Sequence, residues 1–325
     1  MPDPRPRLNQ ALARRFHAAE ALLKSMGSSR RKYLIAVSAG CDSVVLLHWL
    51  RSLGYGNLVV CHVNHHLRGP ASHQDGQFVR RLANRLELVC HLVDAPLSGT
   101  GSVETEAREL RYEQLAKLSR QERCDRVFLA HHADDQAETV LWNLMRGCGL
   151  EGLSGMASMT KREIAGKQLW MLRPLLALDR DDLRGFAKAY RLRWREDESN
   201  QDPAFLRNRI RHQLLPMMEE VSNRPVKRAL GQLAEVAREE HRVMEALVRP
   251  VAPVPTVAEL RLWPVAIQRR WLLRWLRSQN VPDLSHHLIE TIRPMLSVDG
   301  PAKVNLPGGR HCRRTRGRLY LEPGS

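Results

Sequence analysis

Three acidic residues in this sequence lie at positions suited to chemistry on phosphate and amine groups. Asp42 belongs to the small, polar hexapeptide Ser38–Ser43 (SAGCDS), where it would repel a bound phosphate unless a divalent cation lay between them. Asp135 and Glu138 are three residues apart at the start of a predicted helix, so both carboxylates can face one cation or one ammonium group. A helix dipole would explain one acid there, but a cluster exceeds that explanation.

The hexapeptide separates a predicted strand from a predicted helix. Strand-forming residues occupy 33–37, and apolar residues then recur at helical spacing at Val44, Leu47 and Leu50. Small side chains let a phosphate approach the loop, and the amides of the first helical turn face the anion together with the helix dipole. The lysine-containing spacing of ordinary NTPase loops is absent. The pattern therefore indicates a nucleotide–magnesium site, with a serine-rich turn that binds no ligand as the alternative.

The elements around these residues alternate between strand and helix. This order predicts an α/β fold with a doubly wound parallel sheet and helices on both of its faces. In such sheets ligands bind beyond the carboxyl ends of the strands, so the polar residues after Val37 and Val63 belong at one edge. We expect strands at 33–37, 57–63, 88–93 and 126–130, and helices at 9–26, 74–86, 102–120 and 179–190.

Composition narrows the class of partner. The formal net charge is +16, from 51 Lys and Arg against 35 Asp and Glu, which favours a polyanion such as nucleic acid over a merely solvated basic surface. Aromatic residues make up only 5%, so a folded RNA read by shape and phosphate is expected rather than base stacking along a single strand. The six cysteines form no C-x-x-C pair, which argues against zinc, iron–sulfur and disulfide frameworks.

The sequence predicts three regions and a cytoplasmic location. No apolar run is long enough to span a bilayer, and no signal-peptide core is present. The regions are a catalytic domain at 1–216, a helical linker at 217–255 that ends in a proline-rich stretch, and a small, mainly α domain at 256–325. Tryptophans at helical spacing in the last region predict a core. Its basic segment is a candidate for RNA docking, or a solvated tail, through Arg310, Arg313, Arg314, Arg316 and Arg318.

Several ordered motifs resemble those of one enzyme family. SAGCDS resembles the SGGxDS loop of PP-loop ATP-pyrophosphatases. Further segments resemble motifs of tRNA(Ile)-lysidine synthetases and follow in the same order: HVNHHLRG, ARELRY, HHADDQAET with RGCGLEGLSGM, RPL and DESNQDPAFLRNRIRHQLLP. That family uses ATP to attach lysine to the wobble cytidine of an isoleucine tRNA with the anticodon CAU. The modified anticodon reads AUA as isoleucine rather than AUG as methionine.

The resemblance implies a role for each matching residue. ATP would bind Ser38, Ala39, Gly40, Cys41, Asp42 and Ser43, with Asn64 and His65 beside the nucleotide and Asp42 positioning Mg²⁺ and pyrophosphate. Asp135 and Glu138 would bind the lysine ammonium group, and one of them would accept its proton. Arg108 would face the active site and neutralise charge. The remaining substrate contacts would come from His132, Arg207 and Arg211, with the Ser199-Asn200 loop leading into the helix that carries the two arginines.

This sequence departs from the family pattern at two glycine positions and in length. Ala39 keeps an amide donor but resists positive φ, so ATP affinity is expected to change, and His66 is expected to narrow the adjoining pocket. The chain resembles a short form without the second C-terminal domain. Discrimination against elongator methionine tRNA is then expected from the linker and the small domain, and monomer and homodimer both stay open.

Two other functions are compatible with parts of the sequence. A PP-loop tRNA thiolase would need a sulfur-carrying cysteine or a C-x-x-C cluster, which this sequence lacks. A non-catalytic RNA-binding protein with a degenerate loop is favoured by Ala39 alone. The acids Asp42, Asp135 and Glu138 argue against that function, because acids beside RNA serve no purpose in a site that has lost its chemistry.

Overall fold

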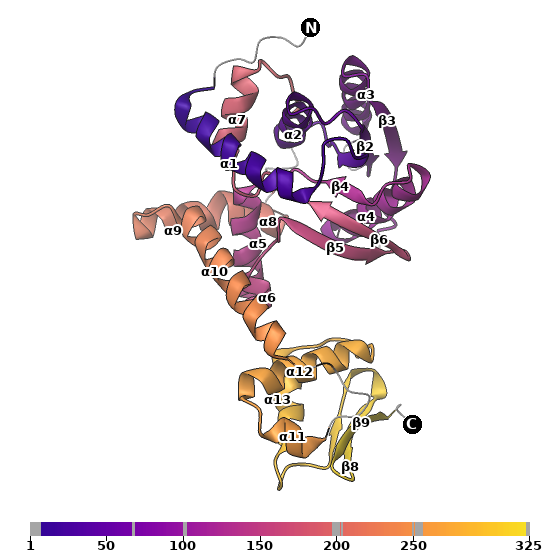
Figure 1. Ribbon diagram of the computed structural model, residues 1–325, viewed down its shortest axis with the longest axis vertical. Coiled ribbons are helices and arrows are strands. Elements are labelled where there is room, and N and C mark those ends of the chain that lie inside the picture. Colours follow the sequence, from indigo (N-terminus) through magenta and orange to yellow (C-terminus); the bar gives the residue numbers. More distant parts are fainter. Residues whose placement is uncertain are drawn as a thin grey trace. The chain divides into compact units, whose positions relative to one another are not determined.

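The computed structural model of the chain describes residues 8–66, 69–99, 103–196, 202, 204–248, 250 and 256–322. The chain divides into two compact units, Met1–Val236 and Ala237–Ser325 (Figure 1). The division into 1–216, 217–255 and 256–325 stays a prediction. The Ser199-Asn200 loop and the linker residues 251–255 lie outside the described residues. None of the described helices is long and apolar enough to cross a membrane.

The first unit is built on a six-stranded sheet with the strand order β3-β2-β1-β4-β6-β5. Neighbouring strands are parallel except for β5 and β6, which form an antiparallel pair at one edge. The expected α/β fold with a mainly parallel sheet is therefore confirmed. The strands are β1 (Tyr33–Ala36), β2 (Leu58–Asn64), β3 (Val89–Asp94), β4 (Arg126–Phe128), β5 (Met159–Ile164) and β6 (Lys167–Leu172).

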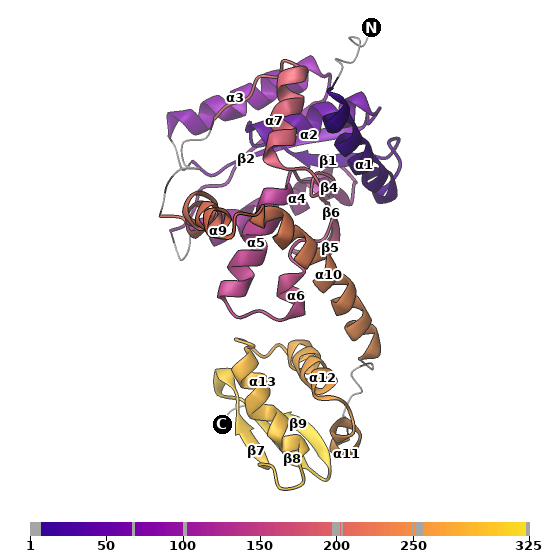
Figure 2. The same cartoon turned by 90° about the vertical axis from the view of Figure 1, so that its left-hand side faces the viewer.

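Helices cover both faces of this sheet, as the alternating pattern predicted (Figure 2). One core contains Phe16, Trp49, Val79 and Phe186, contributed by α1, α2, α3 and α7. A separate core on the other face contains Leu115 and its neighbours on α4. The helices are α1 (Gln10–Met26), α2 (Cys41–Ser52), α3 (Pro70–Arg85), α4 (Val103–Gln121), α5 (Ala133–Met145), α6 (Leu150–Leu153), α7 (Arg180–Ala189), α8 (Leu206–Arg209), a π-helical turn (Ile210–Leu214), α9 (Leu215–Ser222) and α10 (Val226–Leu247), which crosses the boundary between the units.

The second unit has its own core and its own sheet. Trp271 and Trp275 stack with ring centroids 5.7 Å apart and are both buried, so the prediction that these tryptophans form a core is confirmed. The strands β7, β8 and β9 are antiparallel neighbours in that order. The elements are α11 (Val257–Arg261), α12 (Val265–Ser278), α13 (His286–Ile292), two 3₁₀ turns (Arg293–Leu296 and Pro307–Gly309), β7 (Lys303–Asn305), β8 (His311–Thr315) and β9 (Arg318–Glu322).

Strand β8 changes the interpretation of the basic C-terminal segment. The Arg314 guanidinium donates hydrogen bonds to four carbonyls, those of Met295, Ser297, Val298 and Gly300. Arg310 donates to the carbonyl of Gln279, and β9 places Glu322 3.3 Å from Arg313. The segment is therefore a folded hairpin rather than a solvated tail, and at least Arg310 and Arg314 hold the backbone together, while its role in RNA docking stays a prediction.

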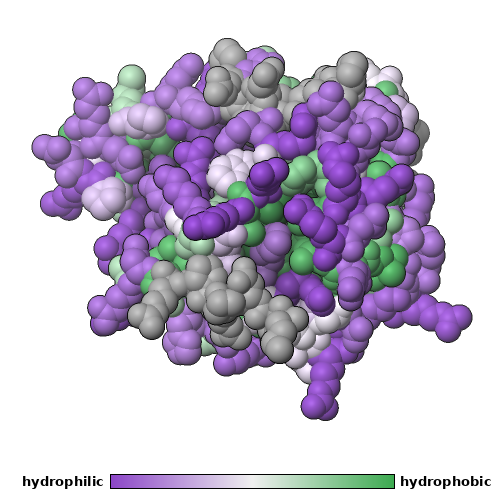
Figure 3. All heavy atoms as spheres, turned by 90° about the horizontal axis from the view of Figure 1, so that it is seen from above, coloured by the Kyte–Doolittle hydropathy of each residue, from purple (hydrophilic) through white to green (hydrophobic). Residues whose placement is uncertain are grey.

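One face of the molecule is mostly polar. On the face in Figure 3, hydrophilic residues predominate and hydrophobic ones show between them.

Candidate active site

A cavity of about 350 Å³ lies at the carboxyl edge of strands β1, β2 and β4. The polar residues that follow each of these strands meet there, as the sheet topology predicted. Ser38, Gly40, Asp42 and Ser43 line it from the loop after β1, while the β2 side contributes the last strand residue Asn64 and then His65. His131 lines the cavity after β4, and Arg111 lines it from α4.

The loop Ser38–Ser43 is held by its own serines. Ser43 Oγ donates to the Gly40 carbonyl at 2.9 Å and accepts from the Ser38 amide at 3.2 Å. Helix α2 begins after Gly40 without a side-chain cap, so no side chain competes for the first amides of the helix. This is the arrangement that an anion at a helix N-terminus requires.

Ala39 and His66 both adopt the left-handed backbone for which glycine is suited. Their φ values are 75° and 57°, so Ala39 takes the positive φ that we expected it to resist. The Ala39 side chain is buried. His66 Nε2 lies 2.8 Å from Asp94 Oδ1, and its amide donates to Asn64 Oδ1 at 2.9 Å. The surrounding contacts therefore hold both residues in a conformation that is strained for a side chain.

His132 connects the acid of the loop with the acids of helix α5. Its Nε2 atom lies 3.4 Å from Asp42 Oδ2 and 3.5 Å from Asp135 Oδ2, and its Nδ1 atom lies 3.6 Å from Asp134 Oδ2. Burial by itself lowers the pKa of His132, but Asp135 and the other carboxylates outweigh burial and raise that pKa to about 10. His132 Nδ1 also accepts a hydrogen bond from the Asp134 amide at 3.3 Å, so the raised pKa favours a proton on Nε2, the atom that faces Asp42 and Asp135.

Arg211 occupies the space beside Glu138. Its Nε and Nη2 atoms donate to Glu138 at 2.6 and 3.0 Å, and Nη2 lies 3.4 Å from Asp135 Oδ1. Arg211 belongs to the π-helical turn Ile210–Leu214, a rare conformation that recurs at functional sites. The structure thus brings together three of the predicted substrate residues, with both Glu138 oxygens engaged by one guanidinium.

The other two predicted arginines make no hydrogen bond to these carboxylates within the described residues. Arg207 Nε lies 3.3 Å from Glu104 Oε1, and the Arg108 guanidinium lies over the ring of Tyr112, 5.1 Å from its centroid. Both still act on the site through their charge. Arg108 contributes to the lowered pKa of His131, and Arg207 opposes the burial that raises the pKa of Glu138.

His131 and Arg111 were absent from the predicted set of site residues, although both line the cavity. Burial lowers the pKa of His131 to about 3, and the positive charge of Arg173 adds to this effect. The His131 ring is therefore neutral. The buried His131 Nδ1 atom has no hydrogen-bond partner among the described residues. Such an atom costs free energy unless a ligand or water satisfies it. The sequence position of His131 could have identified it as a site residue, because it follows β4 and begins the segment His131–Asp135 (HHADD).

Comparison with known proteins agrees with this geometry. Residues 8–218 match the PP-loop domain family, and residues 256–320 match the family described as the TilS substrate binding domain. The class of this protein is therefore that of the PP-loop enzymes. The U34-tRNA thiolase NcsA from Methanococcus maripaludis shares the fold, with a TM-score of 0.56 and 17% identity over 71% of this chain and 81% of that chain.

The relatives define the family more narrowly. A tRNA(Ile)-lysidine synthase of Thermosynechococcus vestitus (strain NIES-2133 / IAM M-273 / BP-1) is 33% identical over 294 residues, 87% of this chain and 83% of that protein. One from Azoarcus sp. (strain BH72) is 35% identical over 94% of this chain and 68% of its own length. One from Solibacter usitatus (strain Ellin6076) is 42% identical over 66% of this chain, but the match spans only 47% of that protein. The chain belongs to the tRNA(Ile)-lysidine synthase family.

Proposed function

We propose that this protein ligates L-lysine to C2 of the wobble cytidine of a tRNA(Ile) with the anticodon CAU, with conversion of ATP to AMP and diphosphate. The product, lysidine, changes the specificity of the tRNA from methionine and AUG to isoleucine and AUA. One observation carries the proposal. Asp42 of the nucleotide loop, which lines the cavity, and Asp135 of α5 both lie within 3.5 Å of the buried His132 ring, so the acids of two separate motifs meet beside the cavity.

The first step activates the cytidine. The oxygen at C2 is a poor leaving group, so it attacks the α-phosphorus of ATP and diphosphate departs, which leaves an adenylylated cytidine. The loop Ser38–Ser43 binds the phosphates through its hydroxyls and through the amides at the start of α2, while Asn64 and His65 lie beside the nucleotide. Arg111 and the neutral His131, which line the same cavity, supply a positive charge and a free ring nitrogen.

The donor set fits Mg²⁺ bound together with the phosphates of ATP. No group of three or more His, Cys, Asp or Glu residues in the described parts of the chain is arranged to hold a metal ion unaided. Mg²⁺ commonly uses one or two carboxylates and completes its octahedron with phosphates and water. Asp42, whose side chain is 29% exposed, is the carboxylate that we assign to it. When bound, the ion neutralises charge that develops on the departing diphosphate.

The lysine ammonium group binds Asp135 rather than Glu138 in our proposal. The Asp135 side chain is 22% exposed, whereas Glu138 is 1% exposed and is chelated by Arg211. Glu138 is therefore a positioning residue that holds Arg211 next to Asp135. Asp135 accepts the ammonium proton, the neutral ε-amine attacks C2, and AMP leaves with the former C2 oxygen. Arg108 and Arg207 stabilise negative charge at the edge of the site.

Two further features support a tRNA substrate. The match of residues 256–320 to a substrate-binding domain favours the second unit as a tRNA-binding module. Membership of the tRNA(Ile)-lysidine synthase family favours the ligase over the thiolase alternative. A cytoplasmic location, where tRNA is modified, is consistent with this function.

The direct test supplies the purified protein with ATP, Mg²⁺, radiolabelled lysine and an unmodified tRNA(Ile) with the anticodon CAU. Label should enter this tRNA but not elongator tRNA(Met), with equimolar AMP and diphosphate. If both tRNAs bind and neither is labelled, the ligase function is refuted and a binding function gains.

The variant Asp135→Asn tests the lysine site within the same reaction. We expect kcat/KM for lysine to fall about 100-fold, which corresponds to about 3 kcal/mol, because the ammonium group loses its charged partner. Diphosphate release in the adenylylation step should fall far less. Glu113→Gln, which neutralises an exposed acid on α4, is the control and should leave both steps unchanged. Intact lysine incorporation in Asp135→Asn would refute this lysine site.

A further inference from the structure

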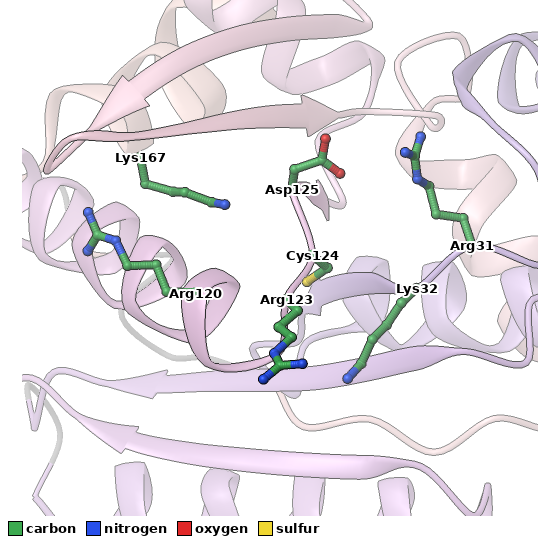
Figure 4. Close-up of a pocket in the computed structure, with 7 residues that line it drawn as sticks. All are labelled: Arg31, Lys32, Arg120, Arg123, Cys124, Asp125 and Lys167. Carbon is green, nitrogen blue, oxygen red and sulfur yellow. The ribbon is translucent and has the colours of Figure 1, made fainter.

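A second cavity lies at the amino edge of the same sheet, opposite the active site. Its volume is about 540 Å³, and its residues come from the starts of β1, β4 and β6 and from the end of α4. Figure 4 shows Lys167 extending toward the centre of this basic hollow. Five cations line it together with Cys124 and Asp125, namely Arg31, Lys32, Arg120, Arg123 and Lys167.

Two of these cations already have structural partners. Lys32 Nζ lies 2.6 Å from Glu122 Oε2, and the Arg120 guanidinium donates to the carbonyl of Ala165. In the described part of the chain, the side chains of Arg31, Arg123 and Lys167 make no hydrogen bond or ion pair. The hollow therefore contains three positive charges that the fold leaves without a direct counter-ion.

The dipole of helix α4 explains only part of this arrangement. Arg123 follows the C-terminal end of α4, where a cation is favourable. Arg31 instead precedes β1, and Lys167 begins β6, so neither belongs to that helix end. Like charges brought together from separate elements destabilise a fold unless a ligand offsets them. Their presence around one hollow, with Lys167 pointing into it and Arg31 and Arg123 at its rim, points to an anion as the missing partner (Figure 4).

The lining also indicates the chemistry of the anion. It contains no aromatic ring, and Cys124 is the only lining residue without a charge, so a base or an apolar group would find little surface. Lys32 and Ser38 flank β1, which at about 3.3 Å per residue places the hollow roughly 20 Å from the nucleotide loop. A substrate that occupied the active site and this hollow at once would have to span about 20 Å, and the cations of the hollow would favour one that carries phosphates.

We propose that Arg31, Arg123 and Lys167 bind backbone phosphates of the substrate RNA outside the anticodon loop. The proposal rests on the proposed function only for the identity of that RNA. Phosphate contacts of this kind hold an RNA in register and carry no sequence information. The site would therefore add affinity for any tRNA and leave the choice between tRNAs to other contacts.

The test compares two triple variants of the full chain. Arg31→Gln, Arg123→Gln and Lys167→Gln remove the proposed contacts, whereas Arg14→Gln, Arg81→Gln and Lys188→Gln remove the same charges from exposed positions on α1, α3 and α7. Binding of a full tRNA transcript is measured over a KCl series without ATP or lysine. We expect the first variant to lose at least tenfold in affinity and about 2–3 in the slope of log K against log salt, because each contact contributes about 0.7–0.9. The control should lose much less.

Two readouts separate binding from a structural role. The melting temperature of the first variant should stay the same or rise, because the substitutions remove repulsion. An isolated anticodon stem-loop should bind the wild type and both variants equally. Equal salt slopes for the two triple variants with full tRNA would overturn the proposal. If the salt slopes are equal and only the first variant loses binding of tripolyphosphate, the hollow binds a small anion instead of RNA. Because no catalysis is measured, a failure of the ligase reaction leaves this test intact.

Discussion

Several polar residues at the start of α5 have structural roles. Asp134 receives a hydrogen bond from the Arg180 amide at 3.0 Å and lies 2.7 Å from Lys227 Nζ, so it joins three helices. Burial opposes ionisation of Asp134, but His132 and Lys227 outweigh it and hold its pKa well below the usual range. Two residues later, Gln136 exchanges hydrogen bonds with the backbone of Met156. Between them, Asp135 accepts a hydrogen bond from the His132 amide at 3.0 Å and so also caps the helix, while its Oδ1 atom lies 3.4 Å from Arg211.

Ala39 has a strained backbone, and we predict that its replacement by glycine changes the free energy of unfolding only slightly. In Ala39→Gly, relief of the strain at φ 75° gains about 1–3 kcal/mol. Loss of a buried methyl group costs about 0.8 kcal/mol and the greater backbone entropy of glycine about 0.5–1 kcal/mol. The free energy of unfolding should therefore change by less than about 2 kcal/mol, as measured by urea denaturation, with ATP binding retained.

Ala39→Val is the informative counterpart. A β-branched residue is poorly tolerated at positive φ, and the site is buried, so we expect a loss of at least 2 kcal/mol together with loss of ATP binding. A variant Ala39→Val as stable and as active as the wild type would contradict the left-handed conformation.

At the residue scale, the spacing of the acids predicted that Asp135 and Glu138 lie on one helix face, but it did not predict which residues contact them. Asp135 and Glu138 share a helix face by their sequence interval alone. Their contact with Arg211 depends on a helix 73 residues further along, so only the fold reveals that Glu138 is occupied. The orphan Nδ1 atom of His131 is likewise a property of packing, which no motif encodes.

At the scale of elements, the strands β1 to β4 and the amphipathic helices were predicted, whereas the polar strands β5 and β8 and the apolar strand β6 were not. β5 pairs with β6 at the sheet edge, and its sequence MTKREI has exposed charged residues where a core strand would be apolar. The strand β8 is rich in arginine and was predicted as a tail for the same reason. Both elements owe their conformation to a neighbouring strand rather than to their own hydrophobic pattern.

The hairpin β8–β9 gives a prediction at this scale. Arg314→Met should destabilise the second unit by about 2–3 kcal/mol, because four carbonyls lose a charged donor. Arg316→Met is the matched control at the exposed turn and should leave stability within about 0.5 kcal/mol. Thermal denaturation of both variants checks the difference. Equal stability of the two would show that the Arg314 bonds contribute nothing net.

At the scale of the whole molecule, each of the two units has its own hydrophobic core and its own sheet. The first unit positions the nucleotide loop and the α5 acids on a parallel sheet, and the second packs helices against a three-stranded antiparallel sheet. The large positive charge belongs to the whole chain, which was evident from composition. Where that charge lacks counter-ions, as at Arg31, Arg123 and Lys167, was not, because these residues lie in three separate parts of the sequence.

The separate cores predict separate unfolding. Trp271 and Phe186 are each 1% exposed, one in the core of the second unit and one in that of the first. Substituting either by alanine should cost about 3–5 kcal/mol through lost burial and a residual cavity. If the units unfold independently, Trp271→Ala lowers only the melting transition of the second unit, and Phe186→Ala only that of the first. Calorimetry detects the transitions, and hydrogen exchange in α12 and α2 assigns them. A single transition lowered equally by both variants would instead mean that the two cores unfold as one cooperative structure.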